Sequence, residues 1–253
     1  MSSHYHQLYT PEDTAVVFID HQPQMTFGVA NINRADLINN VTLLAKAAKL
    51  FQIPTIITAV ETEGFSGYVW PQLLDVFPGQ HVIERTSMNS WDSDEFRKAI
   101  KATGRKNILL TGLWTEVCVT WPAIEMMGDG YNIYVVEDCC GATSRDAQKA
   151  ALSRITQAGG TRLTTIAAIL EFQRDWKNKE HYDALMNLLK QQGGAYGVGV
   201  EYAYTMIHHA HQSAVSTQVV KNDNKLIKER STAGKSVIAG FPPEEAPETL
   251  NTA

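Results

Sequence analysis

The sequence has few cysteines, no long apolar run and no recognisable leader. Its 253 residues include three cysteines, an odd number, and two of these, Cys139 and Cys140, are adjacent. Such a set does not form a disulfide framework, so we expect a reduced, cytoplasmic protein. No apolar stretch approaches the roughly 18 residues of a membrane span, and M-S-S-H-Y-H-Q-L-Y-T-P-E-D lacks the pattern of a signal peptide. We therefore expect no membrane partner.

Positive charge is also scarce. The chain has 22 Lys and Arg against 27 Asp and Glu, a formal net charge of -5. Without a basic surface, nucleic acid is not expected as a partner. His, Cys and carboxylate residues do not stand at a workable metal-binding spacing; His208, His209 and His211 are better explained as a solvated helix face. The sequence thus predicts neither a metal nor another cofactor.

Short apolar runs alternate with helical patterns along most of the chain. Runs typical of buried strands lie at 15–20, 54–60, 81–85, 107–113, 131–138 and 162–166. Between them, capping residues and helical spacing predict helices, for example from Ser144 to Gly159. Alternation of this kind favours a three-layer α/β/α domain with a parallel sheet of about six strands.

The C-terminal part differs in character. The stretch W-K-N-K-E-H-Y-D-A-L-M-N-L-L-K, from Trp176, predicts one amphipathic helix, and V-E-Y-A-Y-T-M-I-H-H-A-H predicts another. The end is rich in Gly, Pro, Ser, Thr and Glu, with too little apolar content to fold alone. We therefore predict a main domain over 1–192, a helical extension over 193–230 and a flexible tail over 231–253.

Three chemically capable residues follow predicted strands. Asp20 ends the first strand, Arg85 ends the third, and Cys118 lies shortly after the fourth, where a helix begins. In parallel sheets, ligands bind beyond the carboxyl ends of the strands. We therefore expect these residues to converge at one edge of the sheet.

The three residue types fit nucleophilic catalysis. A thiol at the first turn of a helix, such as Cys118, lies near unpaired N–H groups and the positive end of the dipole, where a cysteine ionises easily and becomes a nucleophile. Asp20 follows four apolar residues, where burial raises a carboxylate's pKa and suits it to proton exchange. Arg85 supplies a fixed positive charge. Taken singly, Cys118 reads as a core residue, Asp20 as a turn cap and Arg85 as a surface residue; their convergence favours the functional interpretation.

Four motifs resemble those of a known family. They are V-V-F-I-D-H-Q at 16–22, E-R-T-S-M-N-S-W-D at 84–92, G-L-W-T-E-V-C-V at 112–119 and D-G-Y-N-I-Y-V-V-E-D-C-C-G at 129–141. Over roughly residues 10 to 190 the chain resembles the isochorismatase-like cysteine hydrolases, nearest to their YcaC-like branch. The resemblance implies a Rossmann-like fold, a covalent thioester intermediate and an Asp–Lys–Cys triad.

Transferred to this sequence, the resemblance makes Asp20 the general acid/base and Cys118 the nucleophile. It places a cis peptide at Leu113–Trp114 and an oxyanion hole at the N–H groups of Trp114 and Cys118. Arg85 stands where the family has lysine, and it cannot shuttle protons because it stays charged. The absence of a D-x-H motif argues against a zinc nicotinamidase.

Aromatic and amide side chains near the motifs are candidate substrate contacts. Asn89, Trp91 and Trp114 are the predicted substrate-binding residues, although tryptophans are more often core residues. Phe65, Trp70 and Trp121 are further aromatic candidates.

Two functions fit the sequence. The first is a metal-independent cysteine hydrolase that acts on a small amide, or less favourably an ester or vinyl ether, through an acyl-cysteine. The second is a non-catalytic oligomeric scaffold or small-molecule binder with a redox-sensitive Cys118. The resemblance also implies a homo-oligomer larger than a dimer, a tetramer or octamer. Tyr202, Met206 and Ile207 stand at rough helical spacing and are expected at an interface, or else packed on their own domain.

Overall fold

The computed structural model of the chain describes residues 7–207. At its centre lies a parallel sheet of six strands in the order β3-β2-β1-β4-β5-β6. The strands are β1 (Thr14–Ile19), β2 (Thr55–Val60), β3 (Val82–Arg85), β4 (Asn107–Leu113), β5 (Asn132–Gly141) and β6 (Thr161–Leu163). The predicted α/β fold with a six-stranded parallel sheet is confirmed.

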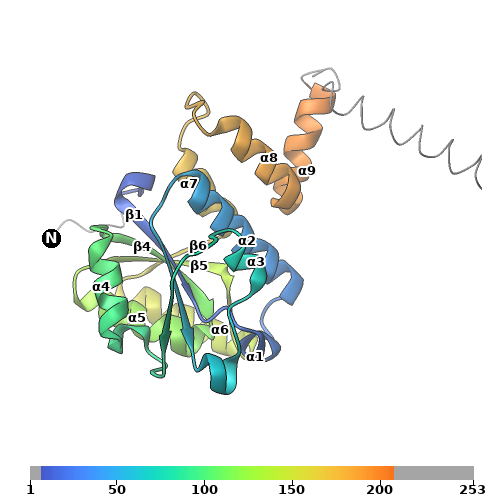
Figure 1. Cartoon of the computed structure of the whole chain (residues 1–253). Coiled ribbons are helices and arrows are strands. Elements are labelled where there is room, and N and C mark those ends of the chain that lie inside the picture. The colour runs from blue at the N-terminus through green and yellow to red at the C-terminus, as the bar shows by residue number, and fades with distance from the viewer. Residues whose placement is uncertain (1–6, 208–253) are drawn as a thin grey trace, which may run out of the picture. The chain divides into compact units, whose positions relative to one another are not determined.

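Helices cover both faces of the sheet, giving three layers (Figure 1). In the described residues they are α1 (Pro23–Phe27), α2 (Arg34–Leu50), α3 (Pro71–Leu74), α4 (Asp94–Ala102), α5 (Thr120–Gly128), α6 (Arg145–Ala158), α7 (Thr165–Gln173), α8 (Tyr182–Gln192) and α9 (Gly194–Tyr202). Helix α2 packs against α3, α7 and α8 on one side, whereas α5 packs against α6 on the other (Figure 1).

The sheet reverses its direction of growth between β1 and β4. From β1 the chain builds outward through β2 to β3, then crosses to β4 and builds outward through β5 to β6. Because β1 and β4 are neighbours, Ile19 is in register with Gly112. The carboxyl ends of these two strands form the switch point at which α/β sheets bind ligands.

The two central strands are buried along their whole length, apart from the first residue of β4. Their carboxyl ends pack so closely that a Cβ atom on Gly112 would lie 2.7 Å from the backbone oxygen of Ile19. A register shift between Leu110 and Gly112 in the pairing of β4 with β5 lies next to this contact. A glycine at position 112 therefore lets the chain leave β4 directly beside the end of β1.

Two local predictions were wrong. The expected strand at 162–166 is only Thr161–Leu163, because helix α7 begins at Thr165, whose N–H donates to Asp138 Oδ1 at 2.8 Å. The helix expected from Trp176 begins at Tyr182. Side chains and carbonyl groups between Asp175 and Asn178 form local turn hydrogen bonds instead, as polar residues of this kind often do.

The chain divides into two compact units, the first comprising residues 1–200. The second is described only over residues 201–207, where α9 ends and a π-helical turn covers Ala203–Ile207. The predicted boundary at 192 falls at the last residue of α8, before the division of the units at Val200, and stays a prediction. Most of the predicted extension, from 208 to 230, and the predicted tail at 231–253 lie outside the described residues, as do His208, His209 and His211.

Candidate active site

Asp20, Arg85 and Cys118 meet at the carboxyl end of the sheet. Asp20 directly follows β1, Arg85 is the last residue of β3, and Cys118 lies in a π-helical turn (Thr115–Val119) between β4 and α5. The Arg85 Nη2 atom lies 2.7 Å from Asp20 Oδ1 and 2.6 Å from Oδ2. The Cys118 thiol is hydrogen-bonded to the same carboxylate. Three strand ends thus contribute to one buried cluster.

Burial and charge act in opposite directions on Asp20. Its side chain is fully buried, and loss of water raises its pKa to about 6. The charge of Arg85 opposes this rise, and the hydrogen bond from Cys118 opposes it further. Asp20 also has a positive φ of 56°, a backbone conformation that aspartate tolerates better than most residues. With this pKa, the carboxylate can accept and return a proton near neutrality.

Cys118 is protonated at rest. Burial raises the pKa of its thiol well above the usual range, the negative charge of Asp20 raises it further, and Arg85 only partly compensates. The expectation that the helix start by itself ionises this thiol is therefore not met. Attack by Cys118 requires a base, and the carboxylate hydrogen-bonded to the thiol is in place to be that base.

Both predicted oxyanion donors have an acceptor within the site, since the Trp114 N–H is hydrogen-bonded to the Cys118 sulfur. The Leu113–Trp114 peptide is cis, as the resemblance implied. The Cys118 N–H donates to the Trp114 carbonyl oxygen at 2.9 Å, so in this conformation it already has an acceptor. The Trp114 indole nitrogen donates to the Met25 carbonyl oxygen at 2.9 Å, which fixes the ring beside the cluster.

A cavity of about 220 Å³ opens beside Cys118. We call it the Cys118 pocket, and its lining residues are Met25, Val60, Glu61, Phe65, Ser66, Thr86, Met88, Trp114, Val117 and Cys118. Apart from Trp114 and Phe65, the non-cysteine lining residues were not candidates from the sequence. They lie after β1, at and after the end of β2, after β3 and after β4, so the strand-end rule that found Asp20 also points to them.

Two predicted substrate contacts lie elsewhere. The Asn89 side chain accepts a hydrogen bond from the Trp91 N–H at 3.1 Å and donates to Glu125 at 2.8 Å. The Trp91 indole donates to Asp129 at 2.9 Å and packs edge-on against Tyr131. Neither residue lines the Cys118 pocket. Their bonding instead ties the segment after β3 to α5 and the turn that follows α5.

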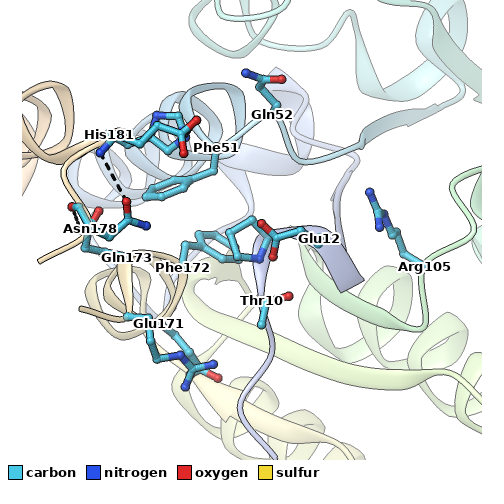
Figure 2. A pocket seen from close by; sticks show the side chains of 13 residues that line it. Thr10, Glu12, Phe51, Gln52, Arg105, Glu171, Phe172, Gln173, Asn178 and His181 are labelled. Carbon is cyan, nitrogen blue, oxygen red and sulfur yellow. Dashed lines mark hydrogen bonds and ion pairs between the residues drawn. The ribbon is translucent and has the colours of Figure 1, made fainter. Parts of the chain in front are cut away.

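A second cavity, of about 440 Å³, lies at the amino ends of the strands (Figure 2). Its lining comes from segments that precede strands, including Glu12, Gln52 and Arg105, and from α7 with the loop after it. Phe51 and Phe172 supply apolar surface near its centre (Figure 2). The described residues that line it include no cysteine.

Metal ligands do not gather in the described part of the chain. Among residues 7–207, no three His, Cys, Asp or Glu side chains lie together as a metal site. His21, next to Asp20, is buried, and burial lowers its pKa to about 3. Its Nε2 atom lies 3.0 Å from Thr111 Oγ1. In the same range of residues, no helix combines the length and apolar character needed to span a bilayer.

The fold and the site define an α/β protein with a buried Asp–Arg–Cys cluster at the switch point of its sheet. Residues 14–167 match the family model for the isochorismatase domain. The chain is 37% identical over 167 residues to "Probable hydrolase YcaC" of Escherichia coli K12, a match that covers 66% of this chain and 80% of the relative. The chain belongs to the isochorismatase family, as a YcaC-type hydrolase.

Solved structures agree with this assignment. One is YcaC from Pseudomonas aeruginosa with hexane-2,5-diol and covalent acrylamide, 32% identical with a TM-score of 0.74, where the match covers 78% of this chain and 96% of that one. Another is the E. coli YcaC gene product, described as an octameric hydrolase of unknown specificity, 32% identical with a TM-score of 0.75. That match covers 80% of this chain and 98% of the E. coli chain.

Proposed function

We propose that the protein is a metal-independent cysteine hydrolase that cleaves the C–N bond of a small amide through an acyl-Cys118 intermediate. The observation that carries this proposal is the position of Cys118, which lines the Cys118 pocket and interacts with the buried Asp20 carboxylate that Arg85 pairs. A protonated nucleophile, a base whose pKa is about 6 and an adjacent cavity are the parts that acyl transfer needs.

The proposed reaction has two halves. Asp20 takes the Cys118 proton while the sulfur attacks the amide carbonyl carbon, forming a tetrahedral oxyanion. As the C–N bond breaks, Asp20 returns that proton to the departing amine, leaving a thioester on Cys118. Asp20 then takes a proton from water, which attacks the thioester and releases a carboxylic acid, and Cys118 regains its proton. The Asp20 carboxylate takes part in every proton transfer of this scheme.

Arg85 has an electrostatic role in this scheme. The guanidinium group stays charged, so it stabilises the Asp20 carboxylate and the developing negative charge but carries no proton. It contacts Asp20 through Nη2, and its Nη1 donates to the Ser87 carbonyl oxygen. Two anchoring contacts hold the charge in the position where the family has lysine.

A small amide is supported by the size of the cavity and by a relative. About 220 Å³ is below the roughly 300–1,000 Å³ of pockets for drug-sized ligands. The solved P. aeruginosa YcaC carries covalent acrylamide, itself a small amide. The alternative function, a binder with a redox-sensitive Cys118, is less well supported because redox-sensing thiols have low pKa values and burial raises that of Cys118.

The test is a panel of small amides, with ammonia release as the readout and intact mass after acid quenching as a second measurement. We expect ammonia release from at least one amide and a mass increase equal to its acyl group on the peptide that contains Cys118. Turnover with no dependence on Cys118, or an acyl group found only on Cys139 or Cys140, contradicts the mechanism.

We further propose a homo-oligomer larger than a dimer, a tetramer or octamer. Val198, Tyr202 and Met206 are 68%, 61% and 57% exposed, so α9 and the turn after it present apolar side chains to solvent. Apolar surface of this kind is commonly covered by a neighbouring subunit. The related E. coli YcaC is described as octameric.

Light scattering tests the assembly on the full chain, on a double variant Tyr202→Asp/Met206→Asp and on a truncation after Gly194. We expect a tetramer or octamer for the full chain and fewer subunits per particle for both altered proteins, with the circular dichroism of the double variant unchanged. A monomeric full chain contradicts the assembly. If neither change reduces the number of subunits per particle, this segment does not lie at the interface.

A further inference from the structure

The Cys118 pocket has a mainly apolar wall. Its apolar side chains come from β2, from the segments after β1 and β2, and from the loops that follow β3 and β4. They are Met25, Val60, Phe65, Met88, Trp114 and Val117. Phe65 is 60% exposed and Met88 56% exposed, so apolar surface continues to solvent at these two residues. An apolar wall of this kind favours an apolar group on the ligand.

In the described part of the chain, the charged side chains at the pocket are one acid, Glu61, and the buried Asp20–Arg85 pair. Glu61 is the one lining residue, among those the structure describes, with a carboxylate or a basic side chain. The deeper charges, Asp20 and Arg85, are buried and paired with each other, so together they add no net charge. No lysine, arginine or histidine belongs to the described lining. A carboxylate on a ligand would therefore meet an acid without meeting a free cation.

Glu61 is fixed in place by its backbone. It has a positive φ of 47°, and its N–H donates to the Arg85 carbonyl oxygen at 3.0 Å. Its side chain folds back over Gly64, since a Cβ atom added there would lie 2.6 Å from the Glu61 carboxylate. The carbonyl oxygen of Glu61 also accepts from the Ser66 N–H at 3.0 Å. The backbone of Glu61 is therefore held in place, and its exposed side chain lies on the wall beside Cys118.

Ser66 is the one buried polar side chain of this wall that remains open to a ligand. It is 1% exposed, it lines the pocket, and its hydroxyl has no hydrogen-bond partner within the described residues. A hydroxyl can donate one hydrogen bond and accept others, which suits a neutral polar group. A single hydroxyl does not replace the hydration of a carboxylate, so it does not offset the cost of burying a charge.

We propose that the Cys118 pocket accepts small, uncharged, mainly apolar acyl groups and rejects carboxylate-bearing ones, with Glu61 setting the charge selectivity. The inference rests on the proposed function only in taking the pocket as the place where the acyl group binds. It extends that function by excluding a class of substrates: amides whose acyl part carries an acid.

The experiment uses two alkylating reagents of nearly equal shape and different charge. In each reaction the Cys118 sulfur forms a C–S bond, iodide leaves with the electrons of the C–I bond, and the thiol proton passes to Asp20 or to water. Rates of modification at Cys118 are measured by peptide mass spectrometry with iodoacetamide, which is neutral, and iodoacetate, which is an anion. Glutathione supplies the intrinsic ratio of the two rates.

We expect iodoacetamide to be favoured at Cys118 by a larger factor than at glutathione. The variant Glu61→Gln should raise the ratio of the iodoacetate rate to the iodoacetamide rate roughly two- to fivefold, the range expected for one exposed charge. The control Glu63→Gln removes a neighbouring exposed acid that hydrogen-bonds Tyr68 and does not line the pocket. It should change neither rate.

A rate ratio equal to that of glutathione, or one that Glu61→Gln leaves unaltered, overturns the proposal, as does a Cys118 that neither reagent modifies. Because alkylation needs no turnover, the outcome is separable from the hydrolase proposal. Charge-selective alkylation without amide hydrolysis keeps the pocket proposal and removes the proposed function. Hydrolysis of acid-bearing amides as fast as neutral ones removes the pocket proposal alone.

Discussion

The Arg85 Nη2 atom contacts both carboxylate oxygens of Asp20, at 2.7 and 2.6 Å, although the residues lie 65 positions apart in the chain. This pair is buried, with side-chain exposures of 3% for Arg85 and 0% for Asp20. Each partner therefore depends on the other, because an unpaired charge in this position is costly. The contact also fixes the carboxylate to which Cys118 is hydrogen-bonded.

Replacement of the nucleophile gives the first prediction. Cys118→Ala should lower amide hydrolysis by roughly a thousandfold or more, since the covalent step is lost, while the fold is kept because the change is small. Steady-state ammonia release and circular dichroism measure the two effects. Cys139→Ala is the matched control, because Cys139 is buried against Thr165, 3.0 Å from its hydroxyl, and lies outside the Cys118 pocket. Wild-type turnover in the Cys118 variant contradicts the mechanism.

The second prediction concerns pH. The pKa of Asp20 is raised to about 6 by burial, and only the deprotonated carboxylate can accept the Cys118 proton. The value of kcat/KM should therefore rise with pH through about 6 and fall about tenfold per unit below it. A neutral amide as substrate keeps substrate ionisation out of the profile. A flat profile between about pH 5 and pH 8 argues against Asp20 as the base.

Changes at Arg85 give the third prediction. Arg85→Met removes the charge that holds down the Asp20 pKa, so the acid limb of the kcat/KM profile should move upward by at least about one unit. Breaking the buried pair should also cost about 3–5 kcal/mol in the free energy of unfolding. Arg85→Lys keeps a positive charge and should leave the limb near its wild-type position. Both effects are read from pH–rate profiles and urea unfolding.

The control for Arg85 is Arg162→Met, which breaks a half-exposed pair with Glu137. Exposed pairs contribute about 0–1 kcal/mol, so this variant should lose little stability and keep the wild-type pH profile. An acid limb that stays in place in Arg85→Met indicates that Arg85 does not control the charge of Asp20.

His21 gives a prediction about stability. Burial lowers its pKa to about 3, below the ordinary value of about 6.5, so the unfolded chain binds the extra proton first. Stability from this group is therefore complete above about pH 6.5 and is lost as pH falls towards 3, with a loss of about 2 kcal/mol by pH 5. In urea unfolding, His21→Phe should show a smaller decrease between pH 7.5 and pH 5 by about that amount. His81→Phe, at an exposed histidine, should retain the full decrease.

The fifth prediction concerns chelation. The described residues contain no cluster of metal ligands, and the proposed reaction uses only Asp20, Arg85 and Cys118. Exhaustive dialysis against EDTA should leave amide hydrolysis within about twofold of the untreated enzyme. Loss of activity that added zinc restores would show that a metal takes part.

The sequence determined the order of strands and helices, because apolar runs and helix caps are local signals. It also predicted that Asp20, Arg85 and Cys118 lie close together, since the carboxyl ends of parallel strands meet on the same side of the sheet. Local signals were less reliable where polar residues had competing partners. The sequence around Thr164 and Thr165 resembled a strand. In the structure Thr164 precedes helix α7, and the Thr165 hydroxyl donates a hydrogen bond to Asp138.

Only the tertiary structure decided the ionisation of the site and the lining of the pocket. The pattern around Cys118 suggested a thiolate, whereas full burial beside the Asp20 carboxylate raises the pKa of the thiol. Asn89 is close in sequence to Arg85, yet its amide bonds Glu125, while Glu61 from another strand lines the pocket. Residues that are neighbours in the sequence can point away from the same site. The pKa of a buried group depends on the exclusion of water and on charges that distant segments bring near it, and a local sequence pattern does not contain this information.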